Sequence, residues 1–525
     1  MMSLWLSGFH TSSAFLSTSF AFQAGIVTVL LILACPLVLD LYYTFGLSQL
    51  PRYNTRRWYE LGYGPAKARY HAAAPIMIKE GLEKHRGPFY IFSDSQYRLV
   101  LPTRYAHMIR NEDRLSLAAF FNEEFHAHIA GFEPFKELNA DNGIVRDVIN
   151  YKLSRSLPQL VDPISQEATI ALRQYWAGDP GDHQEWRELP LKHSVDGIIA
   201  QVMSRAFLMD DLCQDRRWLD IVVEYTEQIF LVARVLRRWP KALRALAASF
   251  LPEPRKLRML LQEARDLLDP VIAKKIASCD GTSTSEKPTS SNLGTFKWFH
   301  ECAKGRPYDA AAMQLSFAFV AIDTTSDTMG NLLSDIAERP ELQDAMREEI
   351  RSVFGNEGLS KPALQKLTLM DSVMKESQRL RPGGLVAMQR IAKDKVVLPD
   401  GTSIPRGTSI MVAAHQTLDT SIEPQDTRFD GYRFVQRNEN ASRNLSTQFV
   451  STSPNYLGFG HGKQACPGRF FAAMEIKVTL CHMLLNYDMK LVKDRNEQTL
   501  VKGHNYTTCP RATIVIRKRK DVFQL

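Results

Sequence analysis

Cysteine is scarce in this sequence, and its placement argues against two kinds of stabilised fold. The seven cysteines among 525 residues are odd in number, widely spread and contain no CxxC pair. Neither a disulfide framework nor a zinc site is therefore indicated, and this cysteine usage suits a reducing compartment.

The chain also lacks internal repeats and any shift in composition that would mark tandem modules. Its length alone would allow about three or four ordinary domains. With 45% hydrophobic and 23% charged residues, the chain has enough apolar surface to bury a large core. One large domain is therefore predicted.

Charge of one sign is not concentrated in any segment. The 65 basic and 57 acidic residues are interspersed, and no basic run exceeds the short one from Arg517 to Lys520. We therefore expect no nucleic-acid partner. The net charge of +8 fits attraction to anionic lipid headgroups.

The first 39 residues contain no Asp, Glu, Lys or Arg, and residues 20–39 are almost wholly apolar. Such a length of helix rises about 30 Å, which matches the hydrocarbon core of a bilayer. A cleaved signal peptide would need a positive charge before the apolar run, and the sequence has none there. We therefore predict a membrane anchor at residues 1–46, spanning at about 20–39, and a domain at residues 47–525. The basic residues that follow place this domain on the cytoplasmic side: Arg52, Arg56 and Arg57.

Beyond the anchor, the pattern predicts a mainly α fold with small β-sheets. Residues 89–103 alternate around a polar turn and predict a strand pair. Amphipathic periodicity predicts long helices at residues 145–177, 194–207, 218–236 and 254–277. Strand-like runs return at residues 408–413 and 511–516. The polar segment 281–292 is predicted to be a surface loop.

The strongest helical period runs from about residue 309 to 338, with Asp309 as the N-cap and Pro340 beyond its end. At about 45 Å, this helix would cross the whole domain. Asp323 and Thr324 lie in its middle, where the surrounding apolar face predicts burial. Buried polar groups cost free energy unless they are hydrogen-bonded. The pair is therefore either satisfied structurally, for example by a threonine bonding back to the preceding turn, or used in chemistry.

Residues 459–468, FGHGKQACPG, place Cys466 between glycines shortly before a predicted helix. A thiolate can reach an iron beneath a flat macrocycle only where its backbone approaches the ring without side-chain obstruction, which glycine allows. Backbone N–H groups of such a loop can point at the sulfur and tune the metal. The pattern indicates a haem-iron ligand, and the alternative is a free cysteine in a tight turn or a small buried residue.

Glu376 and Arg379 form a Glu-x-x-Arg pair on one face of a helix that must end near Pro382. By itself, this spacing is typical of a surface ion pair. Arg433 lies between aromatic residues about thirty positions before the cysteine. Its guanidinium could close a triad with the pair and clamp the cysteine loop to the helical body.

Four features thus follow one another along the chain. They are a helix with an Asp-Thr pair, a helix with Glu-x-x-Arg, an arginine between aromatic residues, and a cysteine between glycines. This order resembles the cytochrome P450 family, and especially the fungal microsomal members that tailor secondary metabolites. The resemblance spans essentially the whole chain. It implies a single large domain of that family behind the transmembrane helix, with haem b (iron protoporphyrin IX) as cofactor.

The resemblance also implies which residues bind the cofactor. Cys466 would be the axial ligand of the haem iron, Phe459 would shield its sulfur, and Gly460 belongs to the same loop. Arg390 matches the family's arginine that pairs with a haem propionate. Gln464 stands where the family usually has arginine or histidine, and a neutral amide can hydrogen-bond a propionate but cannot neutralise it.

For the remaining sites, the resemblance implies that Glu376, Arg379 and Arg433 form the structural clamp. Asp323 and Thr324 would be the catalytic pair that delivers protons.

Two other departures from the family pattern concern the haem surroundings. Val320 and Ala321 replace the small residues that usually precede the acid, which predicts a tighter kink in that helix. No Trp-x-x-x-Arg motif is found for the second propionate, and Lys152 and Arg155 are only nearby candidates.

The activity implied by the resemblance is a monooxygenase in the endoplasmic reticulum membrane. A membrane-bound NADPH-dependent flavoprotein reductase would supply electrons, and the product would be a hydroxylated lipophilic molecule. By the family's layout, the substrate would lie among residues 118–132, Phe317, Ala321, 384–388 and 504–507. These are mostly apolar, which favours a terpenoid or a prenylated alkaloid.

Two alternatives remain open at this stage. One is a haem-thiolate isomerase or dehydratase that needs no reductase, and the other is a non-catalytic haem-binding membrane protein. The Asp323–Thr324 pair discriminates against the first, because enzymes that do not activate O₂ have less need of proton delivery.

Overall fold

The structure is a computed structural model. It describes residues 34–140, 142–177, 185–209, 212–279, 294–415, 428–435, 448–492 and 494–520, together with residues 23, 26, 418, 523 and 525.

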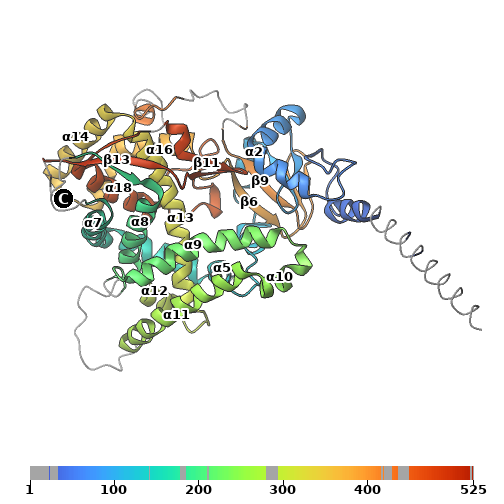
Figure 1. Ribbon diagram of the computed structural model, residues 1–525, viewed down its shortest axis with the longest axis horizontal. Coiled ribbons are helices and arrows are strands. Elements are labelled where there is room, and N and C mark those ends of the chain that lie inside the picture. The colour runs from blue at the N-terminus through green and yellow to red at the C-terminus, as the bar shows by residue number, and fades with distance from the viewer. Residues whose placement is uncertain are drawn as a thin grey trace, which may run out of the picture.

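A six-stranded mixed sheet forms one end of the molecule, next to the start of the chain (Figure 1). In spatial order, its strands are β1 (Arg52–Tyr53), β2 (Phe89–Phe92), β3 (Tyr97–Leu101), β9 (Ser409–Ala413), β6 (Val386–Ala392) and β4 (Leu115–Ser116). β2 and β3 pair antiparallel around the turn at residues 93–96, so the predicted strand pair is confirmed. Helix α2 (Gly64–His85) packs on this sheet and buries Ile78 against it.

Helices make up the larger part of the molecule, so the predicted mainly α fold is confirmed. The first group is α3 (Ala106–Ile109), α4 (Leu117–Glu124), α5 (Glu133–Leu138), α6 (Ile144–Asp147), α7 (Ser154–Trp176), α8 (Leu191–Leu208), α9 (Arg216–Arg237), α10 (Arg244–Phe250) and α11 (Pro252–Cys279). The second group is α12 (Thr295–Ala303), α13 (Ala310–Ala337), α14 (Pro340–Glu357), α15 (Lys361–Gln365), α16 (Thr368–Leu380) and α18 (Arg469–Asn486). The helix predicted at residues 145–177 is divided, because a π-helical turn, Val148–Leu153, separates α6 from α7.

Three small sheets complete the fold. In the first, β13 (Thr513–Lys518) lies between β10 (Tyr487–Lys490) and β5 (Arg187–Pro190) and pairs with both. The other two pair β11 (Thr499–Lys502) with β12 (Asn505–Thr508), and β7 (Val396–Val397) with β8 (Ser403–Ile404). The strand predicted at residues 511–516 corresponds to β13, and that at 408–413 to β9.

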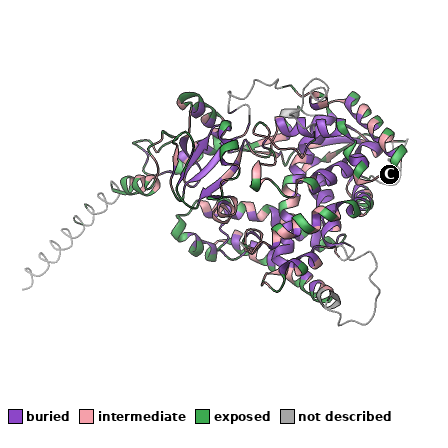
Figure 2. Cartoon of the chain, turned by 180° about the vertical axis from the view of Figure 1, so that it is seen from behind, coloured by how far each residue is buried: buried purple, intermediate pink, exposed green. Residues whose placement is uncertain are grey.

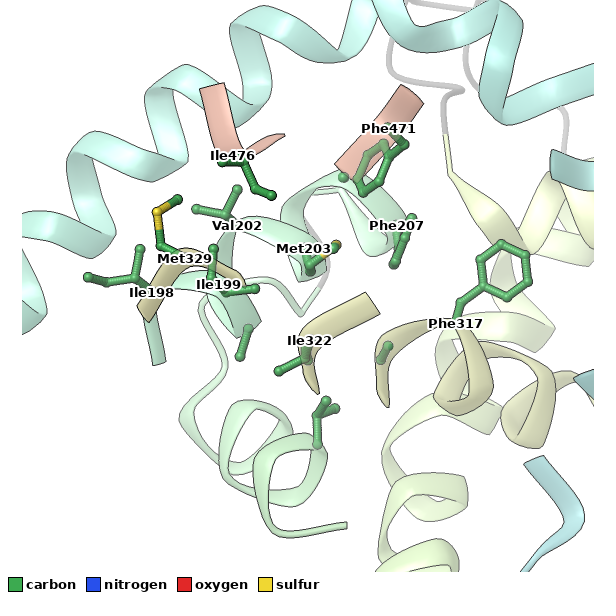
Figure 3. Packing of buried hydrophobic residues seen from close by; sticks show 14 of the residues in the cluster. Ile198, Ile199, Val202, Met203, Phe207, Phe317, Ile322, Met329, Phe471 and Ile476 are labelled. Carbon is green, nitrogen blue, oxygen red and sulfur yellow. The ribbon is translucent and has the colours of Figure 1, made fainter. Parts of the chain in front are cut away.

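Helix α13 is the central element of the helical region. The Asp309 carboxylate accepts the N–H of Ala312 and caps the helix as predicted. Ile322 and Met329 of α13 pack in one core with side chains of α8 and with Ile476 of α18 (Figure 3). Figure 2 shows buried residues along this helix and through the main sheet, with exposed residues on the outer faces. The position of α13 therefore places its middle turns deep inside the molecule.

Within the described part of the chain, no helix has the length and apolar character needed to cross a bilayer. Of the span predicted at residues 20–39, only 23, 26 and 34–39 are described. The loop predicted at residues 281–292 also lies outside the described residues.

Candidate functional site

The glycine-framed loop is closed by its own backbone just before α18. The N–H of Cys466 donates to the carbonyl of Phe459 at 2.8 Å, and Gly460 and Gly462 adopt positive φ angles of 71° and 80°. A side chain at Gly462 would meet the carbonyl oxygen of Arg110, with its Cβ only 2.3 Å away. Glycine is therefore required there both for the backbone turn and for the close approach of the neighbouring segment.

Cys466 is exposed to solvent, although protein atoms crowd around its thiol. Burial raises the pKa of the thiol, whereas the backbone N–H groups of Gly468 and Arg469 point at the sulfur and, with the Arg469 charge, lower it. The predicted arrangement of loop amides around the sulfur is thus present. An accessible sulfur with N–H donors is suited to bind a soft metal centre as a thiolate.

Both ends of the Gln464 side-chain amide are hydrogen-bonded to the protein backbone. Its amide nitrogen donates to the carbonyl of Leu115, and its amide oxygen accepts the N–H of Leu117, both at 2.8 Å. Both ends of the amide are therefore used to hold the cysteine loop to the start of α4. This contact could not be read from the sequence, because the two segments are about 350 positions apart.

The structure brings Glu376, Arg379 and Arg433 together. The Glu376 side chain is fully buried, and its carboxylate receives two bonds from Arg379, Nε at 2.6 Å and Nη2 at 2.7 Å. Arg433 Nε donates to the same carboxylate at 3.0 Å. The N–H of Asp430 adds a fourth bond at 3.1 Å. One carboxylate thus joins α16 to the segment at residues 428–435.

Gln378 of α16 contacts the segment just before the cysteine loop, and this residue was not predicted from the sequence. Gln378 Oε1 accepts a hydrogen bond from the Tyr456 hydroxyl at 2.5 Å. It also lies so close to Gly458 that a Cβ there would come within 2.1 Å. A glutamine between the two clamp residues gives no sequence signal of this role, because the contact depends on tertiary packing.

Arg390 lies in β6 and is 3% exposed. Burial lowers the pKa of its guanidinium to about 10, and among the described residues no carboxylate forms an ion pair with it. Its Nη1 donates to the carbonyl of Gln389 at 2.7 Å. A buried cation without an anionic partner is costly, and a bound carboxylate would offset that cost.

Helix α13 carries an accessible stripe in its middle although most of the helix is buried. Val320 is 39% exposed, Thr324 is exposed, and Ala321 is partly exposed. Phe317, one turn earlier and expected to line the substrate, instead packs in the core, with its ring 4.9 Å from Phe299 (Figure 3). The accessible stripe therefore begins at Val320.

The hydroxyl of Thr324 donates a hydrogen bond to the preceding turn of the helix, which is the structural interpretation of the Asp-Thr pair given above. Its Oγ1 donates to the carbonyl of Val320 at 3.0 Å, and Thr328 repeats the pattern by donating to the carbonyl of Thr324 at 2.8 Å. Because the hydroxyl remains exposed, its lone pairs can still accept a hydrogen bond from a bound molecule. Helix α13 runs unbroken from Ala310 to Ala337 through this point.

Asp323 is the neighbouring acid. Burial, followed by the charge of Asp327, raises its pKa to about 7, while the charge of Lys192 acts in the opposite direction. Its carboxyl group therefore changes protonation state near neutral pH, as a proton donor must.

Lys192 of α8 lies in an ion cluster next to Asp323. It was not among the residues predicted from the sequence. Its Nζ lies 2.9 Å from Asp196 and 3.3 Å from Asp327. The sequence does carry two signals for it. Lys192 and Asp196 have i, i+4 spacing in α8, and Asp323 and Asp327 have the same spacing in α13.

Two of the expected substrate-lining segments lie side by side. The N–H of Leu385 donates to the carbonyl of His504 at 2.8 Å, and the N–H of Tyr506 donates to the carbonyl of Gly383 at 3.2 Å. The segment at residues 118–132 contributes aromatic rings, with Phe125 stacked on Phe135 at 3.9 Å between centroids.

Both residues named as candidates for the second propionate contact neighbouring side chains. Lys152 forms an ion pair with Glu301 of α12, and the guanidinium of Arg155 lies 5.9 Å from the ring centre of Tyr151.

These residues fit a haem group on three counts. Cys466 offers an accessible sulfur in a loop that glycines keep open, and α13 offers an accessible stripe around Thr324. Arg390 offers a buried cation that meets no carboxylate within the described part of the chain. A haem bound through cysteine needs a thiolate ligand, a partner for a propionate and space beside a helix, and the described residues provide each of these.

Comparisons with known proteins give the family. The family model described as Cytochrome P450 matches residues 163–516. The chain is 41% identical to "Cytochrome P450 monooxygenase esdpI" of Penicillium shearii over 84% of this chain and 86% of that protein. It is 40% identical to "Cytochrome P450 monooxygenase adrA" of Penicillium rubens over 90% of this chain and 92% of that protein. It is 38% identical to "Cytochrome P450 monooxygenase pyr3" of Aspergillus fumigatus over 96% of each.

Proposed function

The chain belongs to the cytochrome P450 family, and we propose that this monooxygenase hydroxylates a C–H bond of a lipophilic secondary metabolite with electrons from an NADPH-dependent flavoprotein reductase. Its cofactor is haem b. The single observation that carries the proposal is the accessible Cys466 sulfur in a loop whose Gly468 and Arg469 amides point at it.

On the cysteine side, the protein's part is to hold and tune the cofactor. Cys466 would bind the iron as thiolate, and the N–H groups of Gly468 and Arg469 would moderate the charge on its sulfur. Phe459, which lies against Phe449, would shield the sulfur from water. Arg390 would pair with one propionate. When bound, haem supplies the redox chemistry that activates O₂.

On the α13 side, the protein's part is to position the substrate and supply protons. Thr324 would hold a water molecule or oxygen atom of the bound reactant through its exposed hydroxyl. Asp323, with its pKa near 7, would give up a proton and regain one from solvent within each cycle. Val320 and Ala321 present apolar surface beside Thr324, against which an apolar substrate would pack.

The substrate class follows from the surface expected to contact it. The partly buried Phe121 and the partly buried Ala321 offer apolar surface, and the segments at residues 383–385 and 504–506 are hydrogen-bonded into a single wall. These features support a rigid lipophilic molecule such as a terpenoid or a prenylated alkaloid.

We propose an endoplasmic reticulum location with the catalytic domain in the cytoplasm. Leu37 and Leu41 on the helical segment that enters the domain, and Phe45 in the turn after it, are highly exposed, and such apolar surface suits a lipid environment. Alkaline extraction of membranes and protease protection of the full chain test this. Release of the chain by alkali, or its protection inside sealed vesicles, would contradict it.

The function is tested by incubating the haem-loaded chain with a reductase, NADPH, ¹⁸O₂ and a panel of terpenoids and prenylated alkaloids. We expect a product that carries one ¹⁸O atom and forms only when reductase and NADPH are present. Conversion without reductase would favour an isomerase or dehydratase. No conversion of any substrate by a preparation with full haem content would favour a non-catalytic haem protein.

A further inference from the structure

The ion cluster of Lys192, Asp196 and Asp327 lies between α8 and α13, beside the acid of the proposed proton donor. The ammonium bridges both carboxylates, at 2.9 Å to Asp196 and 3.3 Å to Asp327, and the three side chains are 22%, 11% and 12% exposed. Ion pairs this well covered are less weakened by salt and water than surface pairs.

The carboxylate of Asp327 has a second anchor that fixes its direction. The backbone N–H of Thr508 in β12 donates to Asp327 Oδ1 at 3.1 Å, the same oxygen that Lys192 contacts. Asp327 therefore cannot turn away from Asp323, which precedes it by one helical turn on the same face of α13.

The charged groups around Asp323 come from three elements. Asp327 belongs to α13 itself, Lys192 and Asp196 come from α8, and Arg234 comes from α9. After burial, the two carboxylates raise the pKa of Asp323 and the two cations lower it. Lys192 stays protonated throughout the neutral range: burial alone would lower its pKa, but Asp196 and Asp327 outweigh that effect and hold the pKa above its usual value.

The cluster carries one positive and two negative charges, and hence one excess negative charge beside Asp323. Without Lys192 the excess would be two, and Asp323 would hold its proton to a higher pH. Without Asp196 the excess would vanish, and Asp323 would lose its proton at a lower pH. Lys192 thus supplies the one positive charge that offsets part of the negative charge of Asp196 and Asp327.

We propose that Lys192 is a positioning residue for proton delivery: by holding Asp196 and Asp327 in one ion cluster, it sets whether the Asp323 carboxyl carries a proton beside Thr324. This inference rests on the proposed function, because it assumes that Asp323 delivers protons during turnover. In each delivery the O–H bond of the Asp323 carboxyl breaks, and a new O–H bond forms on the water molecule or reactant oxygen held at Thr324. Solvent then returns a proton to the Asp323 carboxylate.

The first test measures the titration of Asp323 without turnover. Infrared difference spectra of the ferric haem-loaded protein are recorded across pH, and the same series for Asp323→Asn identifies the Asp323 carboxyl band. For Lys192→Met we expect the midpoint of that band to rise by about one pH unit or more, and for Asp196→Asn to fall. Lys192→Arg keeps the cation and should stay near the midpoint of the unaltered chain.

Midpoints that shift in opposite directions in Lys192→Met and Asp196→Asn distinguish this role from general damage to the fold. General damage would shift the midpoint in the same direction in both variants. Lys256→Met, which removes an exposed ion pair with Glu224, is the matched control and should leave the midpoint unchanged. An unchanged midpoint in Lys192→Met overturns the inference. If Lys192→Met does not fold, Asp196→Asn decides, and a midpoint equal to or above that of the unaltered chain overturns it.

The second test follows the ratio of product to NADPH consumed across pH, with the same variants. We expect its pH profile to move with the infrared midpoint in each variant. A profile that stays fixed while the midpoint moves overturns the link to proton delivery. Complete absence of turnover in the unaltered haem-loaded chain contradicts the proposed function instead, and the infrared result then still decides whether Lys192 controls Asp323.

Discussion

Glu376 in α16 and Asp323 in α13 are carboxylates in the same helical region, but the charges around them differ. Glu376 receives bonds from the guanidinium groups of Arg379 and Arg433, so cations outnumber anions at that point. Asp323 faces the carboxylates of Asp327 and Asp196, and Lys192 is in ion-pair contact with those two rather than with Asp323.

The difference shows how one residue class serves two purposes in one fold. A carboxylate that meets two cations and a backbone N–H is held in one geometry and joins segments. A carboxylate beside other anions is held less firmly as an anion and can take up a proton near neutral pH. Charge balance, and not burial alone, therefore separates the structural acid from the reactive one.

The strongest way to break this comparison is Glu376→Gln, which leaves Arg379 and Arg433 against a neutral amide. Breaking a buried ion pair costs about 3–5 kcal/mol, so we expect little folded, haem-loaded protein. The yield of haem protein and the midpoint of thermal unfolding measure the effect. Glu348→Gln, at an exposed position of α14, is the control, and equal yields for the two variants would contradict the clamp.

The raised pKa of Asp323 predicts that the free energy of unfolding depends on pH. Because the folded-state pKa of Asp323 is about 7 and its ordinary value is 3.8, the folded chain binds more protons between these pH values. Relative to Asp323→Asn, the free energy of unfolding should fall by about 1 kcal/mol per pH unit from about pH 4 to pH 7 and then level off. Denaturant unfolding of both chains at several pH values measures this, and parallel curves would show that the acid is not perturbed.

Arg390 is the converse of Glu376: it is a buried cation that no carboxylate contacts among the described residues. If a haem propionate supplies the missing anion, Arg390→Met should release haem about tenfold faster, and Arg390→Lys should lie between. Transfer of haem to an excess of an apoprotein acceptor measures the rate. The exposed Arg406→Met serves as control. Equal release rates for Arg390→Met and Arg406→Met would remove Arg390 from the cofactor site.

The smallest expected effect separates two threonines that make the same bond to the preceding turn. Thr324→Ala and Thr328→Ala each remove one hydroxyl that donates to a helix carbonyl, so their structural costs should match. Only Thr324→Ala should raise the peroxide formed per NADPH, by several-fold, because only Thr324 lies next to the proposed donor. Equal peroxide from both variants would deny Thr324 a part in proton delivery.

The sequence was sufficient where a pattern is local. The strand pair at residues 89–103, the cap at Asp309 and the long central helix follow from periodicity and capping chemistry within a few residues. The spacing of Glu376 and Arg379 likewise put both on one helical face. Such features depend on neighbours in the chain, so the fold class and the main helices could be predicted.

The sequence was insufficient where a role depends on distant partners. The hydrogen bonds of the Gln464 amide to the backbone of Leu115 and Leu117 join segments that are far apart in the sequence. The spacing of Lys192 and Asp196 is visible in the sequence, but the contact of Lys192 with Asp327 forms only when α8 packs on α13. Phe317 faces the core because α12 supplies Phe299. Each outcome was set by tertiary contacts that spacing along the chain does not report.

The central claim, that the Cys466 thiolate binds the haem iron, is tested most directly by the absorption spectrum of the reduced protein under carbon monoxide. We predict the red-shifted Soret band of thiolate-bound haem in the unaltered chain and in Cys509→Ser, and its loss in Cys466→Ser. The same red-shifted band in Cys466→Ser, or its absence from the unaltered haem-loaded chain, would contradict the claim.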